Sequence, residues 1–345
     1  MGLMARIENI VEEVRREHAA DPRHTVYEVD ISEDGVVLVI DAVTSEPTAA
    51  EALESRLGTL EAADLQVVIN RLPGEDTTPG HVLVTSAIAP MLAYPVVSAT
   101  HVSQALLGHR LMVLRVEGRW LQCRSQDGYL GWIHRGYVLP VDEVAARAWE
   151  IGTPGEVCIS LGAVLDGDDG VVARLPWGAR LVREASGEVR LPGGLRGNVR
   201  GELLPLTEQT SRFPLRGPAL VDTASRWIGS PYLWGGTTPS GVDCSGLVQA
   251  IYRTHGLEIP RDSDQQADSG TPVDPGEAFG ELLPGDLLFF EEAPGRITHV
   301  ALSTGAGGII HSSLGNGGVW LNDVAGELDY ERELRSLFAC ARRYA

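Results

Sequence analysis

The stretch Pro231-Tyr-Leu-Trp-Gly-Gly-Thr-Thr-Pro-Ser-Gly-Val-Asp-Cys-Ser-Gly-Leu-Val-Gln249 joins a turn-rich loop to the start of an amphipathic helix. Leu247 and Ile251 fall at a spacing that places them on one helical face. Asp243 is a residue type favoured at helix N-caps, so we expect Cys244 in the first helical turn. The free N–H groups there favour an anion, which predicts a nucleophilic thiol that titrates low. A buried structural cysteine is the alternative, and it is the commoner role for a cysteine chosen at random.

The sequence pattern predicts two antiparallel strands, at residues 297–304 and 307–313, around a glycine-rich turn. If the turn centres near residue 305, His299 and His311 lie directly opposite each other, with Cβ atoms about 5 Å apart. One cysteine and two histidines suit nucleophilic catalysis, in which His299 takes the thiol proton and His311 orients the imidazole. A zinc site is the alternative, but no carboxylate or fourth ligand is arranged with these residues. We therefore predict a thiol-based active site without a metal.

Further motifs occur in order along residues 219–325. They are Tyr232-Leu-Trp-Gly-Gly-Thr-Thr-Pro-Ser-Gly-Val-Asp-Cys-Ser-Gly-Leu-Val248, Pro260-Arg261, Leu283-Pro-Gly-Asp-Leu-Leu-Phe-Phe290 and Thr298-His-Val-Ala-Leu302. Together they resemble the NlpC/P60 cysteine peptidases. The resemblance implies a papain-like α+β fold, in which a helix with the cysteine packs on an antiparallel sheet with the histidine. It assigns Cys244, His299 and His311 as nucleophile, base and third polar residue. Tyr232 matches a family tyrosine that assists the oxyanion site, with a packing role as the alternative.

The overall composition limits the classes of partner. The 345 residues are 43% hydrophobic and 22% charged, as in soluble globular proteins. A formal net charge of −19 argues against nucleic acid and anionic membranes as partners. The beginning of the chain has no apolar core of signal-peptide length, and no apolar run approaches ~20 residues. The four cysteines lack a CxxC pair, so we expect free thiols, no cofactor and a cytoplasmic location.

Changes in sequence texture divide the chain into four predicted units. Residues 1–80 form a small α+β unit with a packing or docking role, with helices at 3–20 and 48–59 and strands at 25–31, 36–43 and 65–70. Residues 81–142 carry short strands, and their run Gly128-Tyr-Leu-Gly-Trp-Ile133 resembles a bacterial SH3-like barrel. Residues 143–212 predict a second, weaker all-β SH3-like domain, and residues 213–345 hold the peptidase domain.

This order of domains resembles the γ-D-glutamyl-L-diamino-acid endopeptidases of murein-peptide recycling. Such enzymes act on peptidoglycan stem peptides (muropeptides) with a free N-terminal L-alanine and release L-Ala-D-Glu. In them the first SH3-like domain closes the cleft behind the dipeptide. By this resemblance, Tyr129, Ser245, Asp262 and Ser263 would contact the L-Ala-γ-D-Glu portion. The alternatives are an exported cell-wall hydrolase and a non-catalytic muropeptide-binding protein.

The free ammonium of such a substrate needs an acidic partner, because an uncompensated buried charge is costly. We would expect relatives to carry an acid at the position of His109, so Asp262 alone or a residue such as Glu117 is left to pair with the ammonium. Arg261 is a candidate for binding a substrate carboxylate, with a surface ion pair as the alternative.

Overall fold

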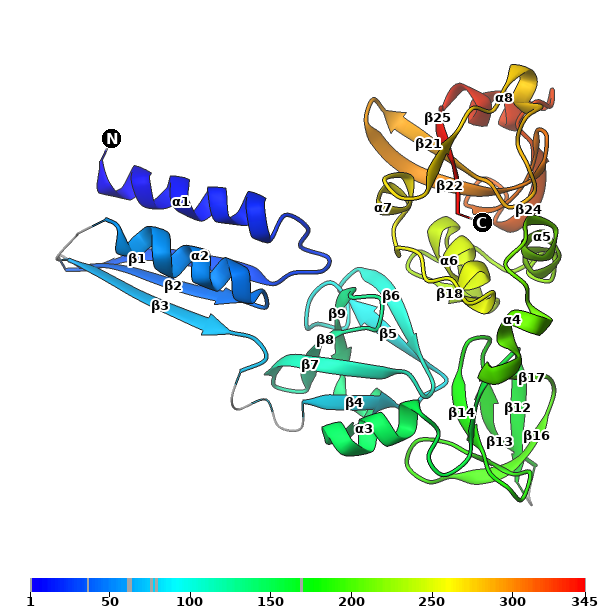
Figure 1. Ribbon diagram of the computed structural model, residues 1–345, viewed down its shortest axis with the longest axis horizontal. Helices are drawn as coiled ribbons and strands as arrows, with labels where there is room; N and C mark the ends of the chain where they lie inside the picture. Colours follow the sequence, from blue (N-terminus) through cyan, green and yellow to red (C-terminus); the bar gives the residue numbers. More distant parts are fainter. Residues whose placement is uncertain are drawn as a thin grey trace.

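The computed structural model describes residues 2–35, 37–60, 64–74, 77, 80–167 and 170–344. The N-terminal unit extends away from the other units, and the C-terminus lies within the C-terminal domain (Figure 1). None of the helices in these ranges has the length and apolarity needed to cross a membrane.

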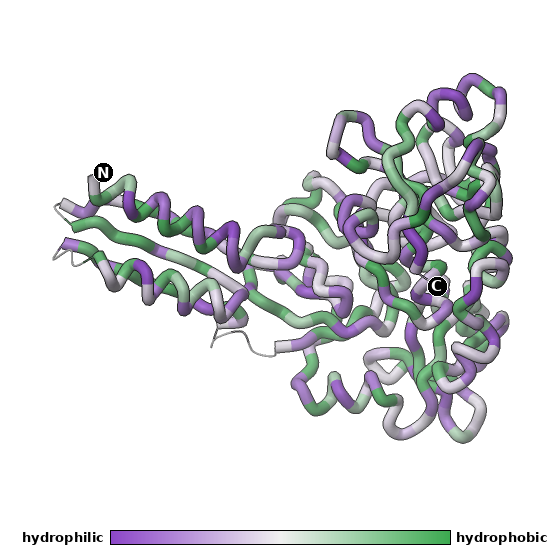
Figure 2. The backbone as a smooth tube through the Cα atoms, turned by 45° about the horizontal axis from the view of Figure 1, so that its top comes forward, coloured by the Kyte–Doolittle hydropathy of each residue, from purple (hydrophilic) through white to green (hydrophobic). Residues whose placement is uncertain are grey.

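The N-terminal unit packs two helices on one face of a three-stranded sheet (Figure 1). Its elements are α1 (Leu3–His18), β1 (Tyr27–Asp34), β2 (Val37–Thr44), α2 (Pro47–Gly58) and β3 (Leu65–Arg71). β1 and β2 are antiparallel, and β3 joins β2 in parallel. Hydrophobic and hydrophilic residues alternate along α1 (Figure 2), and its buried side chains face the same core as Ile40. The predicted order helix, strand, strand, helix, strand is confirmed. It could be predicted because apolar residues recur with helical or strand periods along the unit.

The next two units are β-rich and each contains a seven-stranded sheet. The first runs β4 (His81–Val84), β5 (Ile88–Leu92), β6 (His101–Leu106), β7 (Arg110–Glu117), β8 (Trp120–Arg124), β9 (Leu130–His134), η1 (Arg135–Tyr137) and β10 (Val138–Val141). The second runs β11 (Glu156–Ser160), β12 (Ala163–Gly167), β13 (Gly170–Leu175), β14 (Arg180–Arg183), β15 (Val189–Arg190), β16 (Arg196–Arg200) and β17 (Leu203–Pro205). The strand orders are β10-β4-β7-β8-β9-β5-β6 and β13-β12-β16-β15-β14-β11-β17.

Within the described residues no strand pairing joins the two end strands of either sheet, so neither closes into a barrel. The SH3-like assignment stays a prediction. An additional helix, α3 (Glu143–Glu150), opens the second β-rich unit, where the sequence had suggested strands alone. Asp142 caps this helix, and Trp149 Nε1 donates to Gly108 O at 2.8 Å. The helix therefore packs the two β-rich units together.

The C-terminal domain, predicted as the peptidase domain, combines helices with a six-stranded antiparallel sheet. Its elements are η2 (Leu206–Glu208), α4 (Gln209–Arg212), α5 (Gly217–Ser225), β18 (Thr237–Thr238), β19 (Gly241–Val242), α6 (Cys244–Thr254), α7 (Ser263–Ala267), β20 (Thr271–Val273), η3 (Glu277–Phe279), β21 (Leu287–Ala293), β22 (Arg296–Gly305), β23 (Gly308–Ser313), β24 (Gly318–Asp323), α8 (Asp329–Ser336) and β25 (Phe338–Arg343). The large sheet has the order β20-β25-β21-β22-β23-β24, and β18 and β19 form a separate small sheet.

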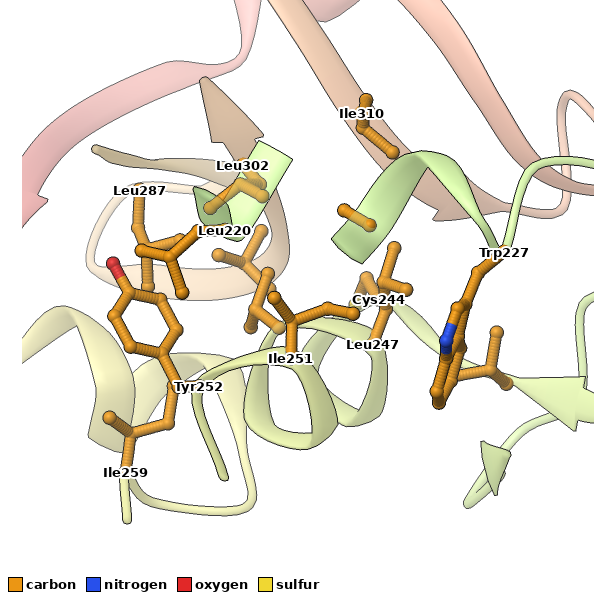
Figure 3. Packing of buried hydrophobic residues seen from close by; sticks show 14 of the residues in the cluster. Leu220, Trp227, Cys244, Leu247, Ile251, Tyr252, Ile259, Leu287, Leu302 and Ile310 are labelled. Carbon is orange, nitrogen blue, oxygen red and sulfur yellow. The ribbon is translucent and has the colours of Figure 1, made fainter. Parts of the chain in front are cut away.

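Helix α6 lies in the centre of this domain. Its apolar face, with Leu247 and Ile251, packs against α5 and against β22 and β23 of the sheet (Figure 3). Leu302 and Ile310 reach this core from the two strands. Burying each such side chain contributes about 1.5–3 kcal/mol. The packing holds the first turn of α6 against the strand that carries His299.

Candidate active site

The loop before α6 positions Cys244 at the first residue of the helix. Asp243 is the N-cap, and its carboxylate accepts from Gly246 N at 2.7 Å and Gly235 N at 2.8 Å. This arrangement satisfies a free donor of the helix and also fixes the preceding glycine loop. The predicted helix start is confirmed, and the helix ends as expected at His255, with Gly256 at φ 83.

The thiol of Cys244 is buried, and its protonation differs from the prediction. Burial, together with the neighbouring Asp243 carboxylate, raises the pKa of Cys244 to about 12. The backbone N–H groups of Val300 and Ser245 act in the opposite direction but are outweighed. The expectation of a low-titrating thiol is therefore wrong for this structure, because desolvation exceeds the effect of the helix start. The thiol at rest is neutral and needs a base.

His299 and His311 form a hydrogen-bonded pair that extends to a third strand. His299 Nε2 and His311 Nδ1 lie 2.7 Å apart, and His311 Nε2 lies 3.0 Å from Asn322 Oδ1 on β24. Burial and the neighbouring His311 lower the pKa of His299 to about 3. Burial also lowers the pKa of His311, against the hydrogen bond that its ring donates to Asn322. Both rings are therefore neutral at pH 7.

The hydrogen bonds assign the tautomers of these rings. Asn316 Nδ2 donates to Asn322 Oδ1 at 2.7 Å, so that oxygen is an acceptor and His311 Nε2 carries the proton that it accepts. The longer approach of Asn316 Nδ2 to His311 Nε2, at 3.2 Å, is then a contact between two donors. His311 Nδ1 accepts from His299 Nε2, which leaves His299 Nδ1 with a free lone pair. This nitrogen is the available proton acceptor.

The register of the histidine hairpin differs from the prediction by two residues. β22 pairs with β23 through Leu302 with Ile310 and Ser303 with Ile309, with a bulge before Gly305. His299 is therefore a diagonal neighbour of His311 and does not lie directly opposite it. The two side chains still share a face, because an even shift preserves the alternation of a strand. The predicted pairing of the two imidazoles is confirmed through their hydrogen bond.

Three residues around this pair were not found from the sequence. Asn322 and Asn316 bond as described above, and the Tyr330 ring stacks on His311 with ring centroids 6.1 Å apart. Asparagines beside glycines are common in turns, and no spacing rule connects them to a histidine on another strand.

Cys244 and His299 line one open cleft of about 730 Å³, a size typical of peptide or small-molecule sites. Tyr232 lines the same cleft, and burial raises the pKa of its hydroxyl, with Cys244 as the second cause. The hydroxyl is therefore protonated and able to donate to an oxyanion.

The predicted substrate-binding residues line the same cleft: Ser245 lies beside Cys244, and Tyr129, Asp262 and Ser263 form the part that we call its acidic end. Tyr129 reaches across from the first β-rich unit, and its hydroxyl donates to Asp262 Oδ2 at 3.0 Å. A tyrosine and a carboxylate from separate units are thus joined by a hydrogen bond. Arg23 of the N-terminal unit also lines this end, although no role was predicted for residues 1–80.

Arg261 lies beneath the cleft, where both of its predicted roles are wrong. Its side chain is 1% exposed and forms a two-point ion pair with Asp243, at 3.1 and 2.7 Å. It also donates to Ser245 Oγ at 2.9 Å and to Ser103 Oγ at 3.2 Å. The guanidinium balances the buried helix cap and so is not presented to a substrate carboxylate or to solvent.

His109 and Glu117 lie away from the catalytic cleft. His109 borders a different pocket between the two β-rich units and the peptidase domain, where its Nε2 lies 3.2 Å from Gly178 O. Glu117 ends β7 and is exposed beside the turn to β8. Neither residue lines the cleft, so the ammonium partner proposed at Glu117 is excluded. Asp262 and Asp264 are the carboxylates of the peptidase domain at the Tyr129 end.

Among the described residues no group of three or more histidine, cysteine or acidic side chains is arranged to hold a metal ion. The chemistry that the site supports comes from its own groups. A buried thiol, an imidazole with a free nitrogen and a protonated tyrosine hydroxyl share one cleft. This set suits acyl transfer through a thioester.

Comparison with known proteins gives consistent matches. The sequence profile of the NlpC/P60 family matches residues 229–336. A γ-D-glutamyl-L-lysine dipeptidyl-peptidase of Bacillus cereus is 31% identical over 230 residues, covering 61% of this chain and 66% of the relative. The Bacillus subtilis protein of the same name is 29% identical over 263 residues, covering 69% and 80%. The crystal structure of an NlpC/P60 family protein from Bacillus cereus superposes with a TM-score of 0.62 at 24% identity, over 76% of this chain and 99% of that chain.

Proposed function

The chain belongs to the NlpC/P60 family of cysteine peptidases, and on this premise we propose that it cleaves the bond between γ-linked D-glutamate and the following diamino acid of peptidoglycan stem peptides. The preferred peptides begin with a free L-alanine, and the product is L-Ala-D-Glu. The observation that supports this proposal is a single cleft with Cys244 at one end and the Tyr129–Asp262 pair at the other.

The two ends of the cleft suit the two ends of such a dipeptide. An N-terminal ammonium is a cation, and Asp262 is a partly exposed carboxylate that already accepts from Tyr129. The γ-carbonyl of D-glutamate would then lie at Cys244, and Ser245 and Ser263 would border the dipeptide between them. A carboxylate that pairs with the ammonium contributes about 1.5–3 kcal/mol of binding.

The proposed reaction has two stages, acylation of Cys244 and hydrolysis of the resulting thioester. Sγ of Cys244 attacks the γ-carbonyl carbon, and the thiol proton passes to the free nitrogen of His299. The C–N bond then breaks, and His299 returns the proton to the leaving amine of the diamino acid. Water attacks the thioester with His299 as base, and the proton ends on Sγ as L-Ala-D-Glu departs. The hydrogen bond to His311 orients the base throughout.

The first β-rich unit would border the cleft beside the dipeptide, since Val102 and Tyr129 line it. We interpret residues 81–142 and 143–212 as SH3-like modules, and Tyr129 lies in the turn between β8 and β9. A stem peptide in intact wall has its L-alanine nitrogen bound in an amide and carries no ammonium. Preference for a free amino end therefore favours wall peptides that have been released, which corresponds to cytoplasmic recycling.

The test is hydrolysis of L-Ala-γ-D-Glu-L-Lys and L-Ala-γ-D-Glu-diaminopimelate, followed by chromatography of L-Ala-D-Glu. The wild-type protein should release the dipeptide, and Cys244→Ala should reduce release by more than about 10³-fold. Cys340→Ala, a free thiol of the same domain on β25, is the matched control and should keep activity. Equal release by wild type and Cys244→Ala would refute the proposal. Release from intact wall but not from free peptides would identify an exported wall hydrolase instead.

A further inference from the structure

Arg23 of the N-terminal unit places a guanidinium at the acidic end of the catalytic cleft. The residue lies in the loop between α1 and β1 and lines the cleft with Asp262 and Asp264. Its Nη1 donates to Asp262 Oδ2 at 3.0 Å and to Asp264 Oδ1 at 2.7 Å. Its Nε and Nη2 bond to Asp21, at 2.9 and 2.8 Å. One side chain thus joins three carboxylates.

The loop that carries Arg23 is held by contacts with both neighbouring units. Arg23 O accepts from Leu130 N of the first β-rich unit at 2.7 Å. The His24 ring meets the Tyr129 ring edge-on, with centroids 5.8 Å apart. Gln265 of the peptidase domain donates to Asp21 Oδ2 at 2.7 Å. These contacts among three units fix the position of the guanidinium at the cleft.

The charges at this end leave room for a second cation. Asp21, Asp262 and Asp264 carry three negative charges, and Arg23 supplies one positive charge. The Arg23 side chain lowers the pKa of Asp21 to about 2 and also lowers the pKa of Asp264, so both are ionised at pH 7. Asp262 Oδ2 already accepts from Arg23 and from Tyr129. A substrate ammonium that binds to Asp262 therefore shares this carboxylate with the Arg23 guanidinium.

We propose that Arg23 is an internal competitor for the ammonium subsite, so that the N-terminal unit sets how tightly the cleft holds the amino end of a peptide. This inference rests on the proposed function, because it takes Asp262 as the partner of the substrate ammonium. Two cations that share one carboxylate repel each other, and the incoming ammonium must displace Nη1 of Arg23 or bind beside it.

The ammonium can displace Nη1 of Arg23 because the guanidinium keeps Asp21 as a partner. When Nη1 leaves Asp262 and Asp264, Nε and Nη2 still bond to Asp21. The Arg23 side chain is 31% exposed, so water can solvate the released donor. The substrate therefore replaces two hydrogen bonds of Arg23 without leaving a buried cation unpaired.

The experiment measures steady-state kinetics of Arg23→Ala and Arg23→Lys on L-Ala-γ-D-Glu-L-Lys and on its N-acetyl derivative. Loss of the competing cation should lower KM for the free-amine peptide about 2- to 5-fold, the size of one partly exposed ion pair, with kcat unchanged. Arg23→Lys retains the charge and should stay near wild type. KM for the N-acetyl peptide should not change, because that peptide carries no ammonium.

Glu28→Ala is the matched control, because Glu28 ties the N-terminal unit to the first β-rich unit through Arg115 but lies outside the cleft. It should leave KM unchanged. If Arg23→Ala fails to fold, Arg23→Gln replaces it as the neutral variant. An unchanged or raised KM in a folded neutral variant overturns the inference while the proposed function stands. Absence of cleavage by the wild-type protein overturns both.

Discussion

The two ends of the catalytic cleft are built in different ways. The thiol end comes from one domain: Cys244 begins α6, and its histidines lie on β22 and β23. It is buried, and its groups are neutral because desolvation opposes charge there. The acidic end is assembled from three units, is partly exposed, and holds charged groups that pair across the units. The proposed chemistry thus lies in a local constellation within one domain, whereas recognition of the amino end of the substrate depends on how the units are packed.

The largest expected effect is on the thiol end. His299→Ala removes the imidazole that we propose takes the thiol proton, so kcat should fall about 10²- to 10⁴-fold. KM should change little, because the acidic end remains intact. Steady-state kinetics with the free-amine tripeptide measure both constants, and His18→Ala on α1 serves as a remote control. A loss of kcat below tenfold would show that another group acts as the base.

A different signature is expected at the acidic end. Asp262→Asn removes the charge that pairs with the substrate ammonium, so KM for the free-amine peptide should rise about 10- to 100-fold. The N-acetyl peptide should be nearly unaffected, because it has no ammonium. If both peptides lose activity equally, Asp262 supports the structure of the cleft and does not recognise the amino end.

The orientation of the base gives a smaller effect. Asn322→Ala removes the acceptor of His311 Nε2 and should lower kcat roughly 3- to 10-fold, the value of one hydrogen bond. Asn322→Asp keeps an acceptor and should retain most of the activity. A change in KM with constant kcat would contradict a positioning role for Asn322.

The last prediction concerns stability in acid. The two ends of the cleft should alter the free energy of unfolding in different pH ranges. Unfolded His299 binds a proton near 6.5, whereas burial lowers its folded pKa to about 3. Between these values the unfolded chain binds more protons, so the free energy of unfolding falls as pH decreases, by at most about 1.4 kcal/mol per pH unit. His299→Gln should make this decline less steep.

At the acidic end, the pH range over which the free energy of unfolding changes is lower. The folded pKa of Asp21 is lowered from 3.8 to about 2, so its contribution is complete above 3.8 and is lost as pH falls toward 2. Asp21→Asn should therefore alter the pH dependence only below about pH 4. Chemical unfolding from pH 7 to pH 3 measures both variants, and a change near pH 6 in Asp21→Asn would contradict this separation.

Several features could be predicted because they depend on local patterns. A capping aspartate before an apolar helical period located Cys244, and strand alternation brought His299 and His311 to one face. The exact register could not be predicted, because the bulge before Gly305 shifts the pairing by two residues. The even shift left the face unchanged, so the functional prediction was insensitive to that error.

The sequence by itself determined the helix and the strands that carry the proposed nucleophile and base, because caps and periodicity act over a few residues. Tertiary structure alone decided three other features: the protonation of Cys244, the burial of Arg261 against Asp243, and the position of Arg23 beside Asp262. Burial and charge pairing depend on which distant segments pack together. Arg23 and Asp262 are separated by 239 positions, and only the packing of the units brings them to one cleft.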